Sequence, residues 1–292
     1  MVLLALGALW LQLFLALIPV WRFGQYYDYG WLVPPVAIVF VLRRRSMGLL
    51  GVPELSSSSR LLSWWAVGAG TLGMAGFLAA LRIVELANSD WRPPLIFHAS
   101  FVVVISHCFV WKAWSRRASL ALLPVTIFAL SAVPYPGRAE TVLISELTGN
   151  VIRATTELFH LSGLPVEQVG DKLALNDEMV EVTEGCSGIR SLQSLVMAGL
   201  FFGEFLLLGW RGRVTLLGVS VVCALVLNVA RAYWLARTQF TEGKAAAMAV
   251  HDIAGHLAFG ISAAVLFLAA SLMRRPRGMK TVVVMKGRPG TP

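Results

Sequence analysis

The sequence predicts an all-α polytopic membrane protein with about eight transmembrane helices. Apolar residues make up 57% of the 292 residues and charged residues only 14%, with a mean hydropathy of +0.71. A soluble domain of this size needs a more polar surface to cover its core, so the composition argues against a soluble protein. The apolar residues also gather into runs near the length of about 20 residues that a helix needs to cross the hydrocarbon layer.

Eight such runs can be distinguished, and the second and fifth are the weakest because they are short and contain Pro34, Pro35 and Pro124. The first run has no basic region before it, so we interpret it as a retained helix rather than a cleaved signal peptide. The eight runs cover residues 2–20, 27–42, 62–82, 95–113, 118–135, 187–209, 214–234 and 251–273.

Basic residues concentrate in alternate loops, and these loops indicate the orientation. They follow the second, fourth, sixth and eighth runs: Arg43, Arg44, Arg45 and Arg60; Lys112, Arg116 and Arg117; Arg211 and Arg213; Arg274, Arg275, Arg277 and Lys280. Short loops rich in Lys and Arg stay in the cytoplasm. We therefore predict a multi-pass protein of the cytoplasmic (inner) membrane with both termini cytoplasmic. The net charge of +9 is explained by topology, and no nucleic-acid partner is expected.

The pattern divides the chain into four parts. Residues 1–135 hold five transmembrane helices, 136–185 an extracytoplasmic segment, 186–273 a three-helix transmembrane unit and 274–292 a basic cytoplasmic tail.

Two elements are expected in the extracytoplasmic segment. Residues 140–162 carry an apolar face at helical spacing, which predicts an amphipathic helix at the outer interface. Residues 166–175 and 179–182 alternate partially around Asn176-Asp177 and predict a short β-hairpin that leads to Cys186.

Three polar residues lie at the ends of the last three apolar runs, on the predicted outer face: Cys186, Arg231 and His251. A cysteine at a helix start meets unpaired amides and the positive end of the helix dipole, which favour the thiolate. A guanidinium close to hydrocarbon needs a partner or a task. A thiol, a cation and an imidazole in one place predict acyl transfer by a cysteine nucleophile, with catalysis in the 186–273 unit.

Each of the three also has a plain structural interpretation. Cys186 can be a boundary cysteine among small residues, and Arg231 can extend its side chain outward to water. His251 can mark a helix start that Asp252 caps. Asn228 lies on the same helical face as Arg231 but deeper, which is harder to explain by outward extension.

Residues around Cys186 are candidates for supporting roles. Glu184 either caps the sixth helix or orients a cation, and Arg190 either holds a substrate carboxylate or pairs with Glu184. The backbone amides after Cys186, at Ser187 and Gly188, could donate to an oxyanion. Glycine at 188 also allows a sharp turn.

The other histidines and cysteines are interpreted as structural, except His256, which competes with His251 and whose role stays open. His256 is rotated about 140° from His251 on a helix, which argues against a shared metal. Local hydrogen bonding is the expected role of His98, His107 and His160. Cys108 and Cys223 fall inside apolar runs and are expected to pack as small hydrophobes without forming disulfides.

Three motifs in this order resemble the exosortase/archaeosortase family: E-G-C-S-G-I-R at 184–190, N-V-A-R at 228–231, and H-x3-G-x3-F across His251, Gly255 and Phe259. The resemblance covers about residues 140–273. Gly185 departs from it, because alanine is commoner there. The family is understood as membrane-embedded cysteine transpeptidases, unrelated in fold to sortase.

The resemblance implies a role for each motif and a class of substrate. It carries the nucleophile onto Cys186, the essential arginine onto Arg231 and the histidine onto His251. The substrates implied are membrane-anchored proteins with a C-terminal tripartite signal: a short motif such as Pro-Glu-Pro, a transmembrane helix and a basic cluster. Membrane lipid and an acceptor molecule are further expected partners. No metal or organic cofactor is required.

Two other functions stay open at this point. The chain could be a polytopic transporter, or an assembly factor of exopolysaccharide or envelope biogenesis, whose polar site binds without reacting. It could also be a membrane protease that uses the same residues for hydrolysis alone.

Overall fold

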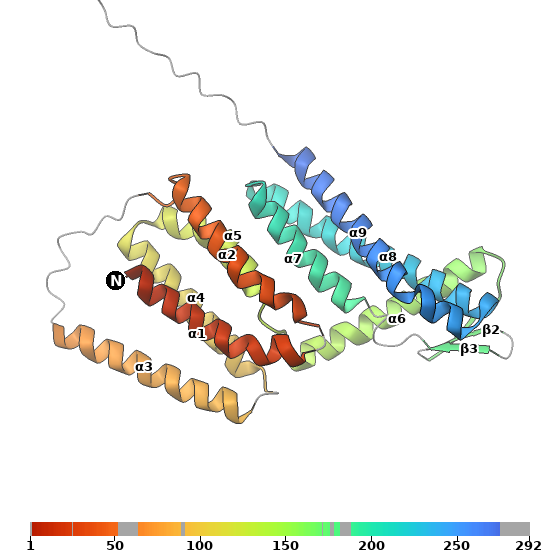
Figure 1. Ribbon diagram of the computed structural model, residues 1–292, viewed down its shortest axis with the longest axis horizontal. Helices are drawn as coiled ribbons and strands as arrows, with labels where there is room; N and C mark the ends of the chain where they lie inside the picture. Colours follow the sequence, from red (N-terminus) through yellow and green to blue (C-terminus); the bar gives the residue numbers. More distant parts are fainter. Residues whose placement is uncertain are drawn as a thin grey trace, which may run out of the picture.

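The computed structural model describes residues 2–24, 26–51, 64–88, 91–170, 172–175, 178–181 and 188–274. These residues are mostly helical and include one small sheet, as the predicted fold class requires (Figure 1). The helices are α1 (Val2–Phe23), the short 3-10 helix η1 (Asp28–Leu32), α2 (Val33–Ser46), α3 (Trp64–Ala87), α4 (Pro93–Ala113), α5 (Arg116–Leu130), α6 (Gly137–Leu161), α7 (Ile189–Phe205), α8 (Trp210–Glu242) and α9 (Lys244–Met273). Arg60, Asn176-Asp177 and the tail beyond Arg274 lie outside the described residues.

Four helices in the described part of the chain are long and apolar enough to cross a membrane. They are α1 over Leu6–Phe23, α4, α8 and α9. Helices α2, α5 and α7 have 14, 15 and 17 residues, which is shorter than the usual span of about 20. The chain is therefore a membrane protein, while the count of eight spans, the four-part division and the orientation stay predictions.

The last two helices are longer than their apolar runs. The runs at 214–234 and 251–273 grow into α8 and α9, which meet at Gly243 with a φ of +89°. Hydropathy detects only the part of a helix that lies in lipid. The intervening residues continue both helices because alanines such as Ala245, Ala246 and Ala247 favour helix without needing a membrane. At 33 residues, α8 is about 50 Å long and exceeds the hydrocarbon core of about 30 Å.

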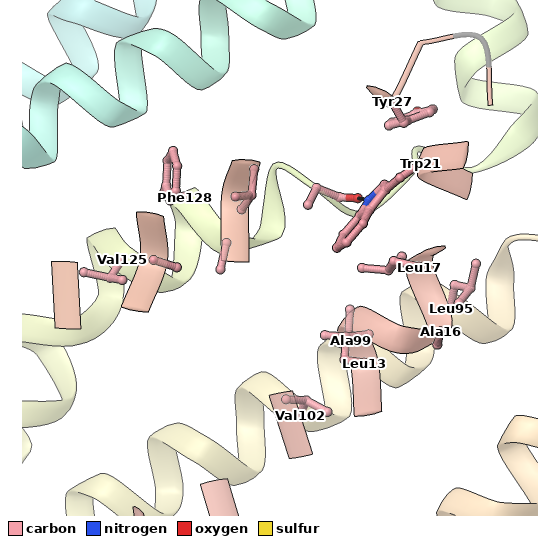
Figure 2. Packing of buried hydrophobic residues seen from close by; sticks show 14 of the residues in the cluster. Leu13, Ala16, Leu17, Trp21, Tyr27, Leu95, Ala99, Val102, Val125 and Phe128 are labelled. Carbon is pink, nitrogen blue, oxygen red and sulfur yellow. Dashed lines mark hydrogen bonds between the residues drawn. The ribbon is translucent and has the colours of Figure 1, made fainter. Parts of the chain in front are cut away.

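The N-terminal helices α1, α2, α4 and α5 share one apolar core (Figure 2). The indole N–H of Trp21 in α1 donates to the Ala132 carbonyl at 2.9 Å, and the Tyr135 amide donates to the Tyr27 hydroxyl at 2.9 Å. Buried aromatic residues with polar tips are tolerated when those tips find partners. The rings of Phe40 in α2 and Phe201 in α7 lie 5.6 Å apart, so this core also holds the C-terminal helices.

Helix α6 lies between the N-terminal helices and the C-terminal helices and runs across one end of both groups (Figure 1). Its start is held by an ion pair between Arg92 and Glu140. Its buried face includes Ile152 and Phe159, which confirms the amphipathic helix predicted for residues 140–162.

The small sheet packs on the C-terminal end of α6 and on the C-terminal half of α8. Strands β1 (Glu167–Val169), β2 (Lys172–Leu175) and β3 (Glu178–Glu181) are antiparallel in the order β1-β2-β3. Leu173 and Val180 pack with Phe159 and with Ala236 of α8. The sheet has one strand more than the predicted hairpin, because Gly170, with a φ of +66°, turns the chain inside residues 166–175. Its extracytoplasmic position stays a prediction.

A buried cluster of three charged residues joins α2, α7 and α8 near the N-terminal end of α8. Glu204 of α7 is 1% exposed. Its Oε2 accepts from Nη2 of Arg44 at 2.6 Å and from Nη2 of Arg213 at 2.8 Å. Arg44 lies near the end of α2 and Arg213 near the start of α8, so two of the stretches that the sequence analysis treated as basic loops belong to helix ends and meet at one end of the bundle.

We predict that Glu204→Leu destabilises the fold by about 3–5 kcal/mol, because it leaves two buried guanidinium groups without their counter-ion. The measurement is the thermal unfolding midpoint of the purified protein in detergent, with the exposed Glu146→Gln of α6 as the control. Replacing all three residues together (Arg44→Met, Glu204→Leu, Arg213→Met) should recover much of the loss. A midpoint for Glu204→Leu equal to that of the control would contradict the role of the cluster.

Candidate functional site

The centre of the candidate site is a contact between Arg231 of α8 and His251 of α9. Nη2 of Arg231 donates to Nε2 of His251 at 2.8 Å. A guanidinium has no acceptor, so Nε2 carries no proton and the ring proton is on Nδ1. That N–H donates to Oδ1 of Asp252 at 3.0 Å. We therefore assign His251 as a neutral imidazole with its base nitrogen held by Arg231.

Gly255 explains how the arginine reaches the histidine. A Cβ placed on Gly255 would lie 3.9 Å from Cζ of Arg231, so the guanidinium lies over the backbone of α9 at this residue. His251 is one turn earlier on the same face of α9. The H-x3-G spacing therefore provides a flat surface for the arginine and a nitrogen at its end.

One prediction about this helix is wrong. Helix α9 begins at Lys244, so His251 does not begin the span and Asp252 does not cap it. Both residues lie in the third turn. Asp252 instead accepts a hydrogen bond from Nδ1–H of His251, and its side chain is 88% exposed.

The start of α7 contacts α8 one turn before Arg231. Gly188 caps α7 with a φ of +80°, and a Cβ there would lie only 2.6 Å from Nδ2 of Asn228. Asn228 is 4% exposed. Only glycine combines this backbone angle with this close approach. The contact fixes the backbone of the cysteine motif at Gly188 against the helix that carries Arg231.

Of the other candidate residues in the cysteine motif, only Arg190 lies in the described part of the chain. Cys186, Glu184 and Ser187 lie outside the described residues, so the meeting of thiol, guanidinium and imidazole stays a prediction. Arg190 is exposed in the first turn of α7.

The three histidines interpreted as structural do make local hydrogen bonds, as predicted. His98 pairs with Glu85 of the preceding helix α3 at 2.9 Å, His107 with Ser119 of the following helix α5 at 2.9 Å, and His160 with the Val166 carbonyl at 2.7 Å.

His256 and the two other described cysteines lie apart from this chemistry. Nδ1 of His256 donates to the Asp252 carbonyl at 2.7 Å, so it braces the helix backbone. Cys108 and Cys223 are free thiols. Among the residues that the structure describes, no group of three or more His, Cys, Asp or Glu side chains could hold a metal ion.

Two polar groups at the site were not anticipated from the sequence. Asp252 was considered only as a possible helix cap, although its position beside His251 was the available signal. The second group is Nε of Arg231, which is buried and has no hydrogen-bond partner within the described part of the chain. A buried donor without an acceptor costs about 1–3 kcal/mol. Nε of Arg231 is therefore an unsatisfied donor at the centre of the site.

Comparison with known families decides the class of this protein. The family model of the transmembrane exosortases matches residues 21–268. The chain belongs to the transmembrane exosortase family. The match begins in α1, so it extends the resemblance seen at 140–273 to most of the N-terminal helices. No curated protein and no solved structure gives a significant match. Membership indicates a membrane transpeptidase of the cysteine peptidase type.

We predict that Gly188→Ala destabilises this exosortase more than Gly170→Ala does. Both glycines have positive φ, which costs other residues about 1–2 kcal/mol. A Cβ at Gly170 meets no atom within 4 Å, whereas one at Gly188 overlaps Asn228. Thermal unfolding midpoints measure the difference, and Asn228→Ala added to Gly188→Ala should recover part of it. Equal midpoints for the two glycine variants would show that the contact does not constrain the chain.

Proposed function

We propose that this exosortase cleaves C-terminal tripartite sorting signals at the extracytoplasmic membrane face, through a thioester on Cys186, and transfers the protein to an acceptor. The observation that carries the proposal is the 2.8 Å contact between Arg231 and a neutral His251. It supplies a base nitrogen and a cation at one point, where helix α8 leaves its predicted membrane segment.

Chain connectivity supports Cys186 as the third member. Consecutive Cα atoms are about 3.8 Å apart, so Cys186 lies within about 8 Å of Gly188. Gly188 contacts Asn228, and Asn228 is one turn from Arg231. The distance that remains between the backbones at Cys186 and Arg231 is comparable to the combined length of the two side chains.

In the first half of the reaction, Nε2 of His251 accepts the proton of the Cys186 thiol, and the thiolate attacks the scissile carbonyl carbon. Protonation of Nε2 removes the acceptor of Arg231 and places two cations side by side, so the guanidinium turns to the new oxyanion. Such donors contribute about 3–4 kcal/mol to acyl-transfer transition states. The Asp252 carboxylate balances the imidazolium.

In the second half, the tetrahedral intermediate collapses as its C–N bond breaks. The imidazolium of His251 gives its proton to the departing amine, which leaves the protein as a thioester on Cys186. His251 is then neutral again. It removes a proton from the amine of the acceptor as that amine attacks the thioester, and the thiolate departs and is reprotonated.

The membrane position suits a substrate with its own transmembrane helix. Such a helix lies beside the spans of the enzyme, which raises the effective concentration of the signal at the site. The basic end of the signal stays in the cytoplasm by the same charge rule that orients the enzyme. Within this orientation the scissile bond meets the outer end of α8.

We predict that Cys186→Ala abolishes processing of a co-expressed protein that carries the tripartite signal. Mass spectrometry of the substrate's C-terminus measures it. Cys108→Ala and Cys223→Ala are matched controls, because these cysteines lie within apolar segments and are expected to leave processing intact. Normal processing by Cys186→Ala would remove the nucleophile assignment.

The same assay separates the other candidate functions. A mild effect of Cys186→Ser with no thioester trapped by hydroxylamine would favour the transporter or assembly factor with a non-catalytic polar site. Cleavage without a joined product, after addition of candidate amines, would favour a hydrolytic protease.

We further predict that Asp252→Asn lowers kcat more than it raises KM. The carboxylate orients His251 and balances its charge without touching substrate. Because the carboxylate is exposed, the loss should be about 10- to 100-fold, below the roughly 10⁴-fold effect of a buried triad aspartate. The control is Glu242→Gln, an exposed acid at the end of the same α8–α9 hairpin. A change in KM alone would assign Asp252 to substrate binding instead.

A further inference from the structure

A cavity of about 280 Å³ lies between α1, α2, α4 and α5, apart from the candidate catalytic site. Its walls come from all four helices and are mostly apolar. Ile38 and Leu42 of α2 line it and are exposed, so the cavity reaches the lipid-facing surface.

The polar atoms in the wall are occupied by one another. The hydroxyl of Ser106 accepts from the indole of Trp10 at 3.0 Å. The two ring nitrogens of His107 contact the hydroxyls of Ser119 at 2.9 Å and Thr126 at 3.0 Å. With these groups already hydrogen-bonded, the interior is suited to an apolar chain and offers little to a polar solute.

The length of the cavity matches one leaflet. It is lined from Ala118 at the start of α5 to Ala129 near its end, a rise of about 16 Å along the helix. The hydrocarbon core is about 30 Å thick, so the cavity covers about half of it. At the end of the cavity near Ala118, the lining also includes Leu50, which follows α2, and Trp114, which caps the end of α4.

The mouth of the cavity at this end is basic. Lys112, Arg116 and Arg117 flank the lining residues Trp114 and Ala118 and are exposed. Residues 33–51 and 91–139, which form this region, contain no acidic residue. In the described part of the chain, none of the three cations forms an ion pair. The nearby Glu204 is already bonded to Arg44 and Arg213. These three exposed cations are therefore not neutralised by any acidic side chain in the described residues.

We propose that this cavity holds one acyl chain of an anionic phospholipid, whose phosphate is bound by Lys112, Arg116 and Arg117. The apolar interior, its depth of one leaflet and its cationic mouth match the three parts of such a lipid. Basic pockets between helices at the cytoplasmic side are a recurring form of anionic-lipid recognition. This end of the helices is the one predicted to be cytoplasmic, so the site is independent of the reaction at Arg231 and His251.

The test is native mass spectrometry of the full chain in detergent with equal amounts of phosphatidylglycerol and phosphatidylcholine that carry the same acyl chains. The wild-type protein should retain phosphatidylglycerol preferentially. Arg116→Gln with Arg117→Gln should weaken that retention about 10- to 30-fold, because each cation near a membrane surface contributes about 1 kcal/mol. The control, Arg211→Gln with Arg274→Gln, removes the same charge from the same end but away from the cavity, and should retain the lipid.

A second variant tests the cavity itself. Gly7 lines it, and a Cβ there meets no atom within 4 Å, so Gly7→Phe fills the space without a clash. It should lower phosphatidylglycerol occupancy, whereas Gly73→Phe, at an equally open position on α3, should not. Equal retention of both lipids by the wild type, no retention of phosphatidylglycerol, or unchanged retention by Gly7→Phe would each overturn the proposal.

Discussion

The guanidinium of Arg231 imposes the main constraint on the C-terminal half of this exosortase. A cation at the depth where a helix leaves hydrocarbon must be given acceptors or water. Helix α9 meets this need with the unprotonated nitrogen of His251, and Gly255 gives the guanidinium room to lie across the helix. The need is only half met, because Nε of Arg231 is buried without an acceptor in the described residues. A site that is incomplete in its resting form and complete with a bound oxygen is what transition-state binding requires.

Charged groups lie at the two ends of α8, with an apolar stretch between them. Arg213 is bonded to Glu204 at one end, and Arg231 to His251 at the other. Arg231 lies 18 positions after Arg213, a rise of about 27 Å along the helix, close to the thickness of the hydrocarbon core. In the predicted topology, this one helix would therefore reach both surfaces of the membrane, with the buried Glu204 cluster at one end and the candidate catalytic residues at the other. The sheet and the end of α6 pack on the same half of α8 as Arg231.

The sequence predicts those features that depend on the membrane or on helical period. Apolar runs located the helices, and the apolar face of residues 140–162 predicted α6. What it missed depends on contacts between helices or on helix outside lipid. Hydropathy did not show that α8 and α9 continue to Gly243. This continuation excludes the alternative in which Asp252 caps the helix, and Asp252 is instead the partner of His251. The burial of Glu204 between two arginines was equally hidden, because its partners lie on separate helices, α2 and α8. The third strand was missed because Gly170 splits a run that alternates only partly.

The same hydrogen bond that satisfies Arg231 also sets the order of chemical events in the proposed mechanism. While Arg231 donates to Nε2, the imidazole stays neutral and cannot release a proton to a leaving group. Once Nε2 takes the proton of a thiol, the bond is lost and the guanidinium must find another acceptor. The oxyanion that forms at that moment is such an acceptor, so base action and oxyanion stabilisation are coupled through one arginine. A lysine could supply the charge but not a second N–H fixed in the same plane, which is why a guanidinium suits this position.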